Sequence, residues 1–254
     1  MKQRKLDWRP RFDNRSRLYG ISDVLNIKDT DGISVLWGEG TVLDQGSEGA
    51  CVGFGWAGEI LAQPVAPVVQ PTEDQGNRNA LEYYKRAKKL DQWPGENYDG
   101  TSVIAGAKVM KEMGFIQEYR WCFSIEELRA AVISEGPVVI GIPWYESMYY
   151  TDHNGKVVIA GKEVGGHCLV VTGYISNMLV DGVQQEVFRW RNSWGSDYGI
   201  NGSAFITYKD LSKLVSHNAE MCVPMGRRIP PEGLRLTKSG VCSRLFSRWF
   251  KKNN

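Results

Sequence analysis

The chain of 254 residues is long enough to bury one large core or two smaller ones without disulfides or metals. Hydrophobic residues make up 42% of it and charged residues 24%, which excludes fibrous and low-complexity proteins. The uncharged apolar stretch 137–145 is about half of a membrane span, and no apolar segment follows the basic N-terminus. We therefore expect a cytoplasmic protein, because these features do not predict a secretory signal.

The five cysteines are spread along the chain without a CxxC pair, which fits neither a disulfide framework nor a zinc site. We expect free thiols and no metal or cofactor. Charge is uneven: seven Lys or Arg and two Asp lie in 1–17, eight Lys or Arg and one Glu lie in 226–254, and the part between is acidic. Such ends can bind nucleic acid, an anionic membrane or a partner protein, or can lie back on the acidic body.

The first half of the chain is predicted to be helical. Periodicity and capping signals predict helices over 50–62, 77–90, 101–113 and from 124 onward. Thr101 or Ser102 can cap the third helix, and Ser124 with Glu127 forms the sequence pattern of a capping box.

After Gly136-Pro137 the sequence becomes strand-like. Runs rich in β-branched and aromatic residues predict strands at 138–142, 156–160, 167–175, 185–191 and 203–208. Asp181-Gly182, between two of these runs, is typical of a tight hairpin turn. This segregation of helices and strands predicts the α+β class, with a mostly antiparallel sheet in the second half.

Cys51 is the strongest candidate for a nucleophile. A glycine-bearing loop leads directly into the predicted helix, so the thiol lies at a helix N-terminus, where the dipole favours the thiolate. A single cysteine is also commonly a small buried apolar residue. The choice between these alternatives depends on the residues around it.

Three other residues supply what a nucleophilic thiol requires. The Gln45 side-chain amide can donate to an oxyanion beside the sulfur. His167 opens an apolar strand and can act as the base, and Asn192, at the end of the following strand, can orient its imidazole.

These residues fall in three blocks in a fixed order: DQGSEGAC at 44–51, GGH at 165–167 and NSWGSDYGING at 192–202. In these blocks the sequence resembles the papain family of cysteine peptidases. Segments 8–10, 17–19 and 94–102 are similar to its bacterial and viral branch, including bacteriophage members. The resemblance covers roughly residues 7–225.

The resemblance implies a papain-like two-lobed α+β fold with the active site in the cleft between the lobes. We expect a basic N-terminal arm at 1–20, a peptidase domain at 21–225 and a basic tail at 226–254 with a short amphipathic helix. Within the peptidase domain the helical N-terminal lobe spans about 40–135, and the antiparallel, β-rich C-terminal lobe spans about 136–225.

The implied activity is that of an endopeptidase that hydrolyses peptide bonds of a polypeptide substrate through a Cys51 thioester, with His167 as general acid and base. Two alternatives remain. One is a virion or assembly component that uses the papain fold for binding, and the other is an amide transferase or isopeptide hydrolase. Under the virion alternative, we expect the protein in the virion as well as in the cytoplasm.

By the same resemblance, substrate contacts fall on five residues: Gly100, Gly141, Gly165, Cys168 and Trp194. Gly100 would pair with the substrate backbone, and Trp194 would shield the bond between His167 and Asn192. The other three are small and imply a roomy, apolar pocket, with Trp144, Tyr145 and Met148 nearby.

The charge of the two ends leads to two further expectations. The first ~20 residues, basic against an acidic body, are expected to lie in or near the cleft and to cause latency. In the tail, apolar residues recur at helical spacing among basic ones, which indicates a helix that packs on the body or docks to a partner protein, an anionic membrane or nucleic acid.

Overall fold

The computed structural model describes residues 4–11, 13–30 and 32–229. Its α-helices are α1 (Cys51–Leu61), α2 (Glu73–Leu90), α3 (Val103–Glu112), α4 (Ile125–Ser134) and α5 (Tyr208–Val215). Short 3-10 helices are η1 (Asn14–Tyr19), η2 (Ile21–Asp23), η3 (Ile27–Thr30) and η4 (Glu146–Tyr149). None of the helices in these described ranges is long and apolar enough to cross a membrane.

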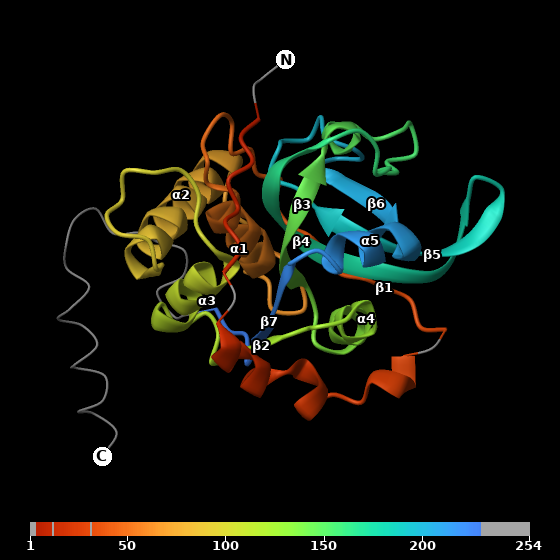
Figure 1. Cartoon of the computed structure of the whole chain (residues 1–254), viewed down its shortest axis with the longest axis horizontal. Helices are drawn as coiled ribbons and strands as arrows, with labels where there is room; N and C mark the ends of the chain where they lie inside the picture. Colours follow the sequence, from red (N-terminus) through yellow and green to blue (C-terminus); the bar gives the residue numbers. More distant parts are fainter. Residues whose placement is uncertain (1–3, 12, 31, 230–254) are drawn as a thin grey trace.

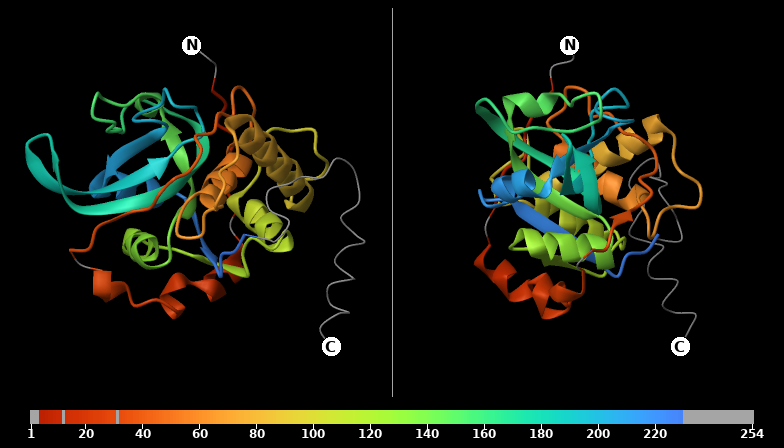
Figure 2. Two further views of the ribbon diagram at one scale, coloured as in Figure 1. Left: turned by 180° about the vertical axis from the view of Figure 1, so that it is seen from behind. Right: turned by 90° about the vertical axis from the view of Figure 1, so that its right-hand side faces the viewer.

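The strands of the described residues form one antiparallel sheet in the order β2-β7-β3-β4-β5-β6, with β1 added beside β4. They are β1 (Val35–Leu36), β2 (Glu118–Trp121), β3 (Val138–Tyr145), β4 (Glu163–Val180), β5 (Val183–Arg191), β6 (Ser203–Thr207) and β7 (Glu220–Met225). The long β4–β5 hairpin projects from the body (Figure 2), and its turn is Asp181-Gly182 with both residues at positive φ.

Several predicted elements are confirmed by the structure. The Ser102 hydroxyl accepts from the Ala105 amide and begins α3, and the Ser124 hydroxyl accepts from the Glu127 amide at 3.1 Å and begins α4. The Glu127 carboxylate, however, accepts from the amide of Phe123 rather than that of Ser124. The capping box is therefore displaced by one residue.

The predicted strand at 156–160 is wrong. This segment makes one isolated bridge, from Lys156 to Phe205, and otherwise runs as a loop. The predicted helix at 77–90 begins earlier, at Glu73, because Thr72 and Gln75 form a capping box there.

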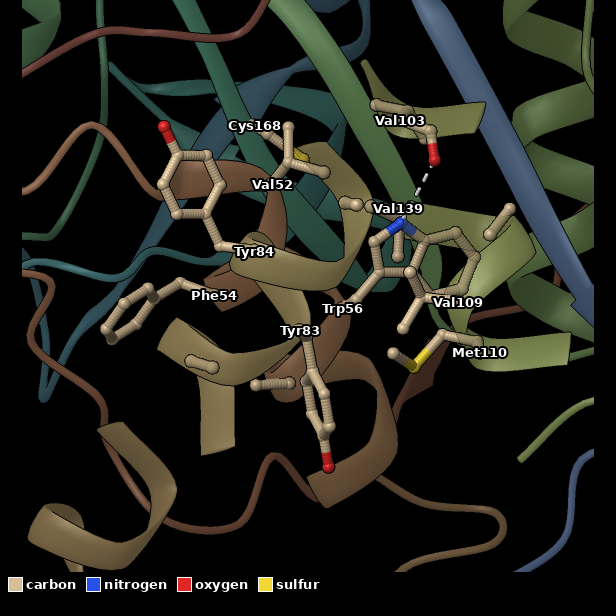
Figure 3. Packing of buried hydrophobic residues seen from close by; sticks show 14 of the residues in the cluster. Val52, Phe54, Trp56, Tyr83, Tyr84, Val103, Val109, Met110, Val139 and Cys168 are labelled. Atoms are coloured by element: carbon tan, nitrogen blue, oxygen red, sulfur yellow. Dashed lines mark hydrogen bonds between the residues drawn. The ribbon is translucent and has the colours of Figure 1, made fainter. Parts of the chain in front are cut away.

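Two hydrophobic clusters form the core. The first lies among α1, α2 and α3, where the Trp56 indole donates to the Val103 carbonyl at 3.2 Å (Figure 3). Glycines let α1 pack closely: a Cβ at Gly53 would lie 2.3 Å from the Ala80 carbonyl oxygen of α2. α1 also contacts β4, so the helices and the sheet meet along this helix.

The second cluster lies between the sheet and α4 and α5. It contains Ile125 and Leu128 of α4, a helix that we expected within the helical lobe at 40–135. The side chains of α4 therefore pack with the strand-rich part of the molecule.

Candidate active site

Cys51 is the first residue of α1. Its N-cap, Ala50, has no side-chain acceptor, so no side-chain cap satisfies the amide groups of the first turn. The thiol is fully buried, and this burial raises the pKa of Cys51 to about 12, although backbone hydrogen bonds from Cys168, Asp7 and Val52 act in the opposite direction. The Cys168 contact brings the sulfur beside the residue that follows His167.

His167 and Asn192 come from neighbouring strands of the sheet. His167 lies on β4 and Asn192 directly follows β5, and Nε2 of the histidine is 2.8 Å from Oδ1 of the asparagine. Trp194 covers this pair, with its ring centroid 4.8 Å from the imidazole, and Trp144 contacts the imidazole edge to face. Asn192 therefore sets the ring orientation and leaves Nδ1 without a hydrogen-bond partner among the described residues.

Burial of the imidazole favours its neutral form. Burial lowers the pKa of His167 to about 4, whereas the hydrogen bond that its Nε2 donates to Oδ1 of Asn192 acts to raise it. Nδ1 has no hydrogen-bond partner among the described residues. Burial therefore shifts the pKa values of Cys51 and His167 in the directions that favour the uncharged thiol and the uncharged imidazole.

Gln45 is fixed by the residue after Asn192. The Ser193 hydroxyl donates to Oε1 of Gln45 at 2.6 Å, and the Gln45 amide nitrogen of the backbone donates to the Ser193 carbonyl at 2.8 Å. The side-chain Nε2 donates to the carbonyl oxygens of Glu48 at 2.8 Å and Lys5 at 3.4 Å. The structure thus brings together all four catalytic candidates.

The N-terminal strap, defined as residues 4–11, covers this site. In Figure 1 it is the red segment that passes between the helices and the sheet. The backbone amide of Trp8 donates to the Gly166 carbonyl of β4 at 2.9 Å, and that of Arg9 donates to the Thr101 carbonyl, just before α3, at 3.0 Å. The strap is therefore held on both sides of the site by backbone hydrogen bonds.

Charged side chains of the strap pair with the acidic body. Arg4 bonds to the Asp44 carboxylate and donates to the Trp194 carbonyl at 2.6 Å. Lys5 pairs with Asp99 at 2.8 Å. Of the alternatives for the basic N-terminus, self-docking is the one that the structure shows for the strap.

The glycines predicted to bind substrate lie against the strap. A Cβ at Gly100 would lie 1.9 Å from the Asp7 carbonyl oxygen, and one at Gly165 would lie 3.0 Å from Cβ of Leu6. A Cβ at Gly141 would lie 2.2 Å from Nε1 of Trp8. The strap thus occupies the surface that the resemblance assigns to substrate.

The Trp8 site, defined as the space that the Trp8 indole fills, has an acidic floor. Gly141 is in register with Cys168 on β4 and with Glu220 on β7, so these three residues share one face of the sheet. The indole donates to Oε2 of Glu220 at 2.7 Å. The prediction of a purely apolar pocket is therefore wrong at this position. Trp144, which we expected near the pocket, packs against the His167 ring.

Sequence reasoning did not identify Glu220 or Trp8 as parts of the site. They are 212 positions apart, and no motif links them. The sequence holds one weak signal for this site: the acidic Glu220 directly precedes the apolar run MCV at 221–223. The predicted tail helix, to which the partner predictions apply, lies in 230–254, outside the described residues.

Comparison with known proteins gives three results. The family model for papain family cysteine proteases matches residues 73–223, which is more than half of the chain. An uncharacterized peptidase C1-like protein of Acanthamoeba polyphaga mimivirus is 22% identical over 210 residues, which cover 66% of this chain and 64% of that protein. The match thus spans less than two thirds of this curated relative.

Among solved structures, xylellain, a cysteine protease from Xylella fastidiosa, aligns with a TM-score of 0.63 and 20% identity, over 90% of this chain and 99% of that one. Digestive procathepsin L 3 of Tenebrio molitor aligns with a TM-score of 0.47 and 15% identity, over 77% and 73%. The xylellain alignment indicates the same fold, a papain-like mixture of helices and antiparallel sheet. The chain belongs to the papain family of cysteine proteases.

Proposed function

We propose that the protein is a cysteine endopeptidase that hydrolyses peptide bonds through a Cys51 thioester and that rests in a covered, latent state. The observation that carries this proposal is the 2.8 Å contact between His167 and Asn192, which orients the imidazole next to Cys168, the residue whose backbone contacts the Cys51 thiol at the start of α1. A binding scaffold has no use for this arrangement. An intact orienting asparagine and a fixed amide donor therefore favour catalysis.

The reaction begins when the Cys51 thiol gives its proton to Nδ1 of His167, and the thiolate attacks a peptide carbonyl carbon. Nε2 of Gln45 and the backbone amide of Cys51 donate to the resulting oxyanion. The imidazolium then protonates the leaving amine as the C–N bond breaks, which leaves a thioester. A water molecule that loses its proton to His167 hydrolyses the thioester, and the proton returns to sulfur.

The strap supports the latent state in this proposal. Both reacting groups are buried in this state, which raises the pKa of the thiol and lowers that of the imidazole and so favours their uncharged forms. Its Lys5 carbonyl also takes a hydrogen bond from the donor that a substrate oxyanion needs. Displacement of the strap would admit water and substrate, and the charged thiolate–imidazolium pair could then form.

The test is intact-mass labelling with an epoxysuccinyl peptide inhibitor, at neutral pH under reducing conditions. The full chain, Trp8→Ala and Trp8→Ala/Cys51→Ala are compared. We expect one adduct in Trp8→Ala, slower labelling in the unaltered chain, and no adduct when Cys51 is absent.

Two results would contradict parts of this proposal. Equal labelling of the unaltered chain and Trp8→Ala would reject the latent state. An unlabelled Trp8→Ala whose Cys51 still reacts with iodoacetamide would reject the peptidase, because the thiol would then be accessible but not activated.

A further inference from the structure

The side-chain amide of Asn192 has one end that the mechanism leaves unused. Its Oδ1 is fully engaged, because it lies 2.8 Å from Nε2 of His167 and accepts from the Ser193 backbone amide at 2.7 Å. Its Nδ2 is buried and forms no hydrogen bond of normal geometry with the described residues. An amide nitrogen removed from water is costly unless an acceptor lies beside it. The orientation of Asn192 therefore depends on the group that faces this nitrogen.

The hydroxyl of Tyr198 is the group that faces Nδ2. Burial raises the pKa of the Tyr198 phenol, whereas the side chains of Trp190 and Asn192 act to lower it as hydrogen-bond donors. Nε1 of Trp190, like Nδ2 of Asn192, forms no normal hydrogen bond elsewhere among the described residues. The hydroxyl proton is directed away from both, since it is donated to the Met148 carbonyl at 3.3 Å. The phenol oxygen is therefore left to accept from the two N–H groups.

The backbone and the neighbouring ring hold Tyr198 in this place. The backbone amide of Asn192 donates to the Gly202 carbonyl, and the amide of Gly202 donates to the Tyr198 carbonyl, both at 2.9 Å. The Trp194 ring, which covers the imidazole, contacts the Tyr198 ring edge to face at 5.2 Å. Tyr198 is 6% exposed, so close packing leaves its ring little room to turn the hydroxyl away. The hydroxyl is thus fixed on the side of the carboxamide that carries Nδ2.

We propose that Tyr198 is a positioning residue of the active site, whose hydroxyl accepts from Nδ2 of Asn192 and so fixes the carboxamide that orients His167. This inference rests on the proposed function, since it deepens the mechanism of the same site. A half-turn of the carboxamide would place Nδ2 against the Nε2–H of His167 and Oδ1 against the phenol. The phenol disfavours that state, because its proton is already donated to the Met148 carbonyl. Through Asn192 the hydroxyl thus supports the histidine tautomer that carries its proton on Nε2 and keeps Nδ1 as an acceptor.

The first test follows the proton on Nε2 of His167 by NMR in the full chain, and it does not depend on catalysis. The chain has three histidines, so isotope-labelled histidine gives few signals to assign. We expect a protected Nε2–H in the unaltered chain, and in Tyr198→Phe this proton should exchange with water about tenfold faster. The matched control is Tyr149→Phe: the Tyr149 ring stacks on Trp194 at 5.5 Å, but only burial shifts the pKa of its hydroxyl.

The second test measures whether the hydroxyl acts through Asn192. Rates of Cys51 labelling by the epoxysuccinyl inhibitor are compared at neutral pH in the Trp8→Ala background. Tyr198→Phe should slow labelling about tenfold there, because the imidazole is no longer held in one orientation. When Asn192→Ala is also present, Tyr198→Phe should change the rate by less than about twofold, since the group through which it acts is gone.

Three results would overturn the inference: an unchanged Nε2–H in Tyr198→Phe, equal effects of Tyr198→Phe and Tyr149→Phe, or full slowing by Tyr198→Phe in the absence of the Asn192 carboxamide. If Tyr198→Phe fails to fold, the reciprocal measurement uses the chain with tyrosine labelled at the ring carbon that bears the hydroxyl. Asn192→Ala should then shift the Tyr198 signal, and an unmoved signal would count against the inference.

The outcome is separable from that of the proposed function, because the Nε2–H is observed whether or not Cys51 reacts. Labelling of Cys51 with no response of His167 to Tyr198→Phe rejects the role of Tyr198 and keeps the peptidase. A response of His167 in a protein whose Cys51 does not label keeps the role of Tyr198 in orienting the imidazole and rejects the peptidase.

Discussion

The side-chain amide of Gln45 donates to the carbonyl oxygen of Lys5 at 3.4 Å. The donor that the proposed mechanism assigns to the substrate oxyanion is thus engaged by the chain's own N-terminal strap. The same amide also donates to Glu48 at 2.8 Å, so it is held in place whether or not the strap is present. The covered state therefore needs no rearrangement of Gln45 to become competent.

The first prediction concerns this donor. In the Trp8→Ala background, Gln45→Ala should lower kcat by about 10²-fold, because one oxyanion donor is lost. Alkylation of Cys51 by iodoacetamide forms no oxyanion and should change by less than about twofold. An equal loss in both rates would show that Gln45 acts on the thiol rather than on the oxyanion.

The second prediction uses a glycine to displace the strap. A Cβ at Gly141 would lie 2.2 Å from Nε1 of Trp8, so Gly141→Ala should expel the indole from its site. We expect the amides of Trp8 and Arg9 to lose protection from hydrogen exchange and Cys51 to alkylate about tenfold faster. The control is Gly58→Ala in α1, whose nearest neighbour, Val170, would lie 3.2 Å away. Unchanged exchange at Trp8 in Gly141→Ala would contradict the prediction.

The third prediction is a pH dependence of stability. The pKa of Glu220 in the folded protein is about 7, above its ordinary value of 4.5, so folding favours the protonated carboxyl. Its contribution is full below pH 4.5 and declines as the pH rises toward 7. Relative to Glu220→Gln, the unaltered chain should lose roughly 3 kcal/mol of unfolding free energy across this interval.

Urea unfolding of both proteins at several pH values measures this difference. Glutamine keeps the size and the acceptor of the side chain but does not titrate. If the two stability curves run parallel from pH 4.5 to 7, the carboxyl of Glu220 does not titrate as expected.

The fourth prediction concerns the segment that follows β5. The carboxylate of Glu39 pairs with Arg189 at 3.1 Å and with Arg191 at 2.9 Å, next to Asn192. Glu39→Gln leaves two largely buried guanidinium groups without a counter-ion and should cost about 3 kcal/mol in a urea unfolding experiment. The surface pair of Glu82 and Arg86 supplies the matched control, since Glu82→Gln should cost less than about 1 kcal/mol. Similar losses in both variants would argue against a special role of Glu39.

The sequence could point to the candidate catalytic residues because each lies in a local pattern. Cys51 begins a helix after a glycine-bearing loop. His167 lies on β4, and Asn192 directly follows β5, the strand joined to β4 by a recognisable hairpin. Each of these signals spans only a few residues. The order of the three sequence blocks along the chain supplied the rest of the information from which we predicted the site.

The Trp8 site was not predictable in the same way. β7 begins with Glu220 and contains Pro224, residue types that are uncommon in strands, so the sequence does not indicate a strand there. Trp8 lies in a basic segment that reads as a solvated end, yet it is 6% exposed. The segment at 156–160 gave the opposite error, because we predicted a strand where the structure has a loop. The strand-like alternation of its residues reflects one buried residue, Val157, within that loop.

The strap is also part of the core that it covers. Trp8 belongs to the first hydrophobic cluster and links β4, β7 and the segment before α3. Burial of such an aromatic side chain contributes about 3 kcal/mol to folding, a large share of the stability of a typical domain. The open form of the active site is therefore the less stable form of the chain. If the proposed latent state holds, a molecule whose strap is displaced would be both competent to cleave and easier to unfold and degrade, and its active lifetime would be short.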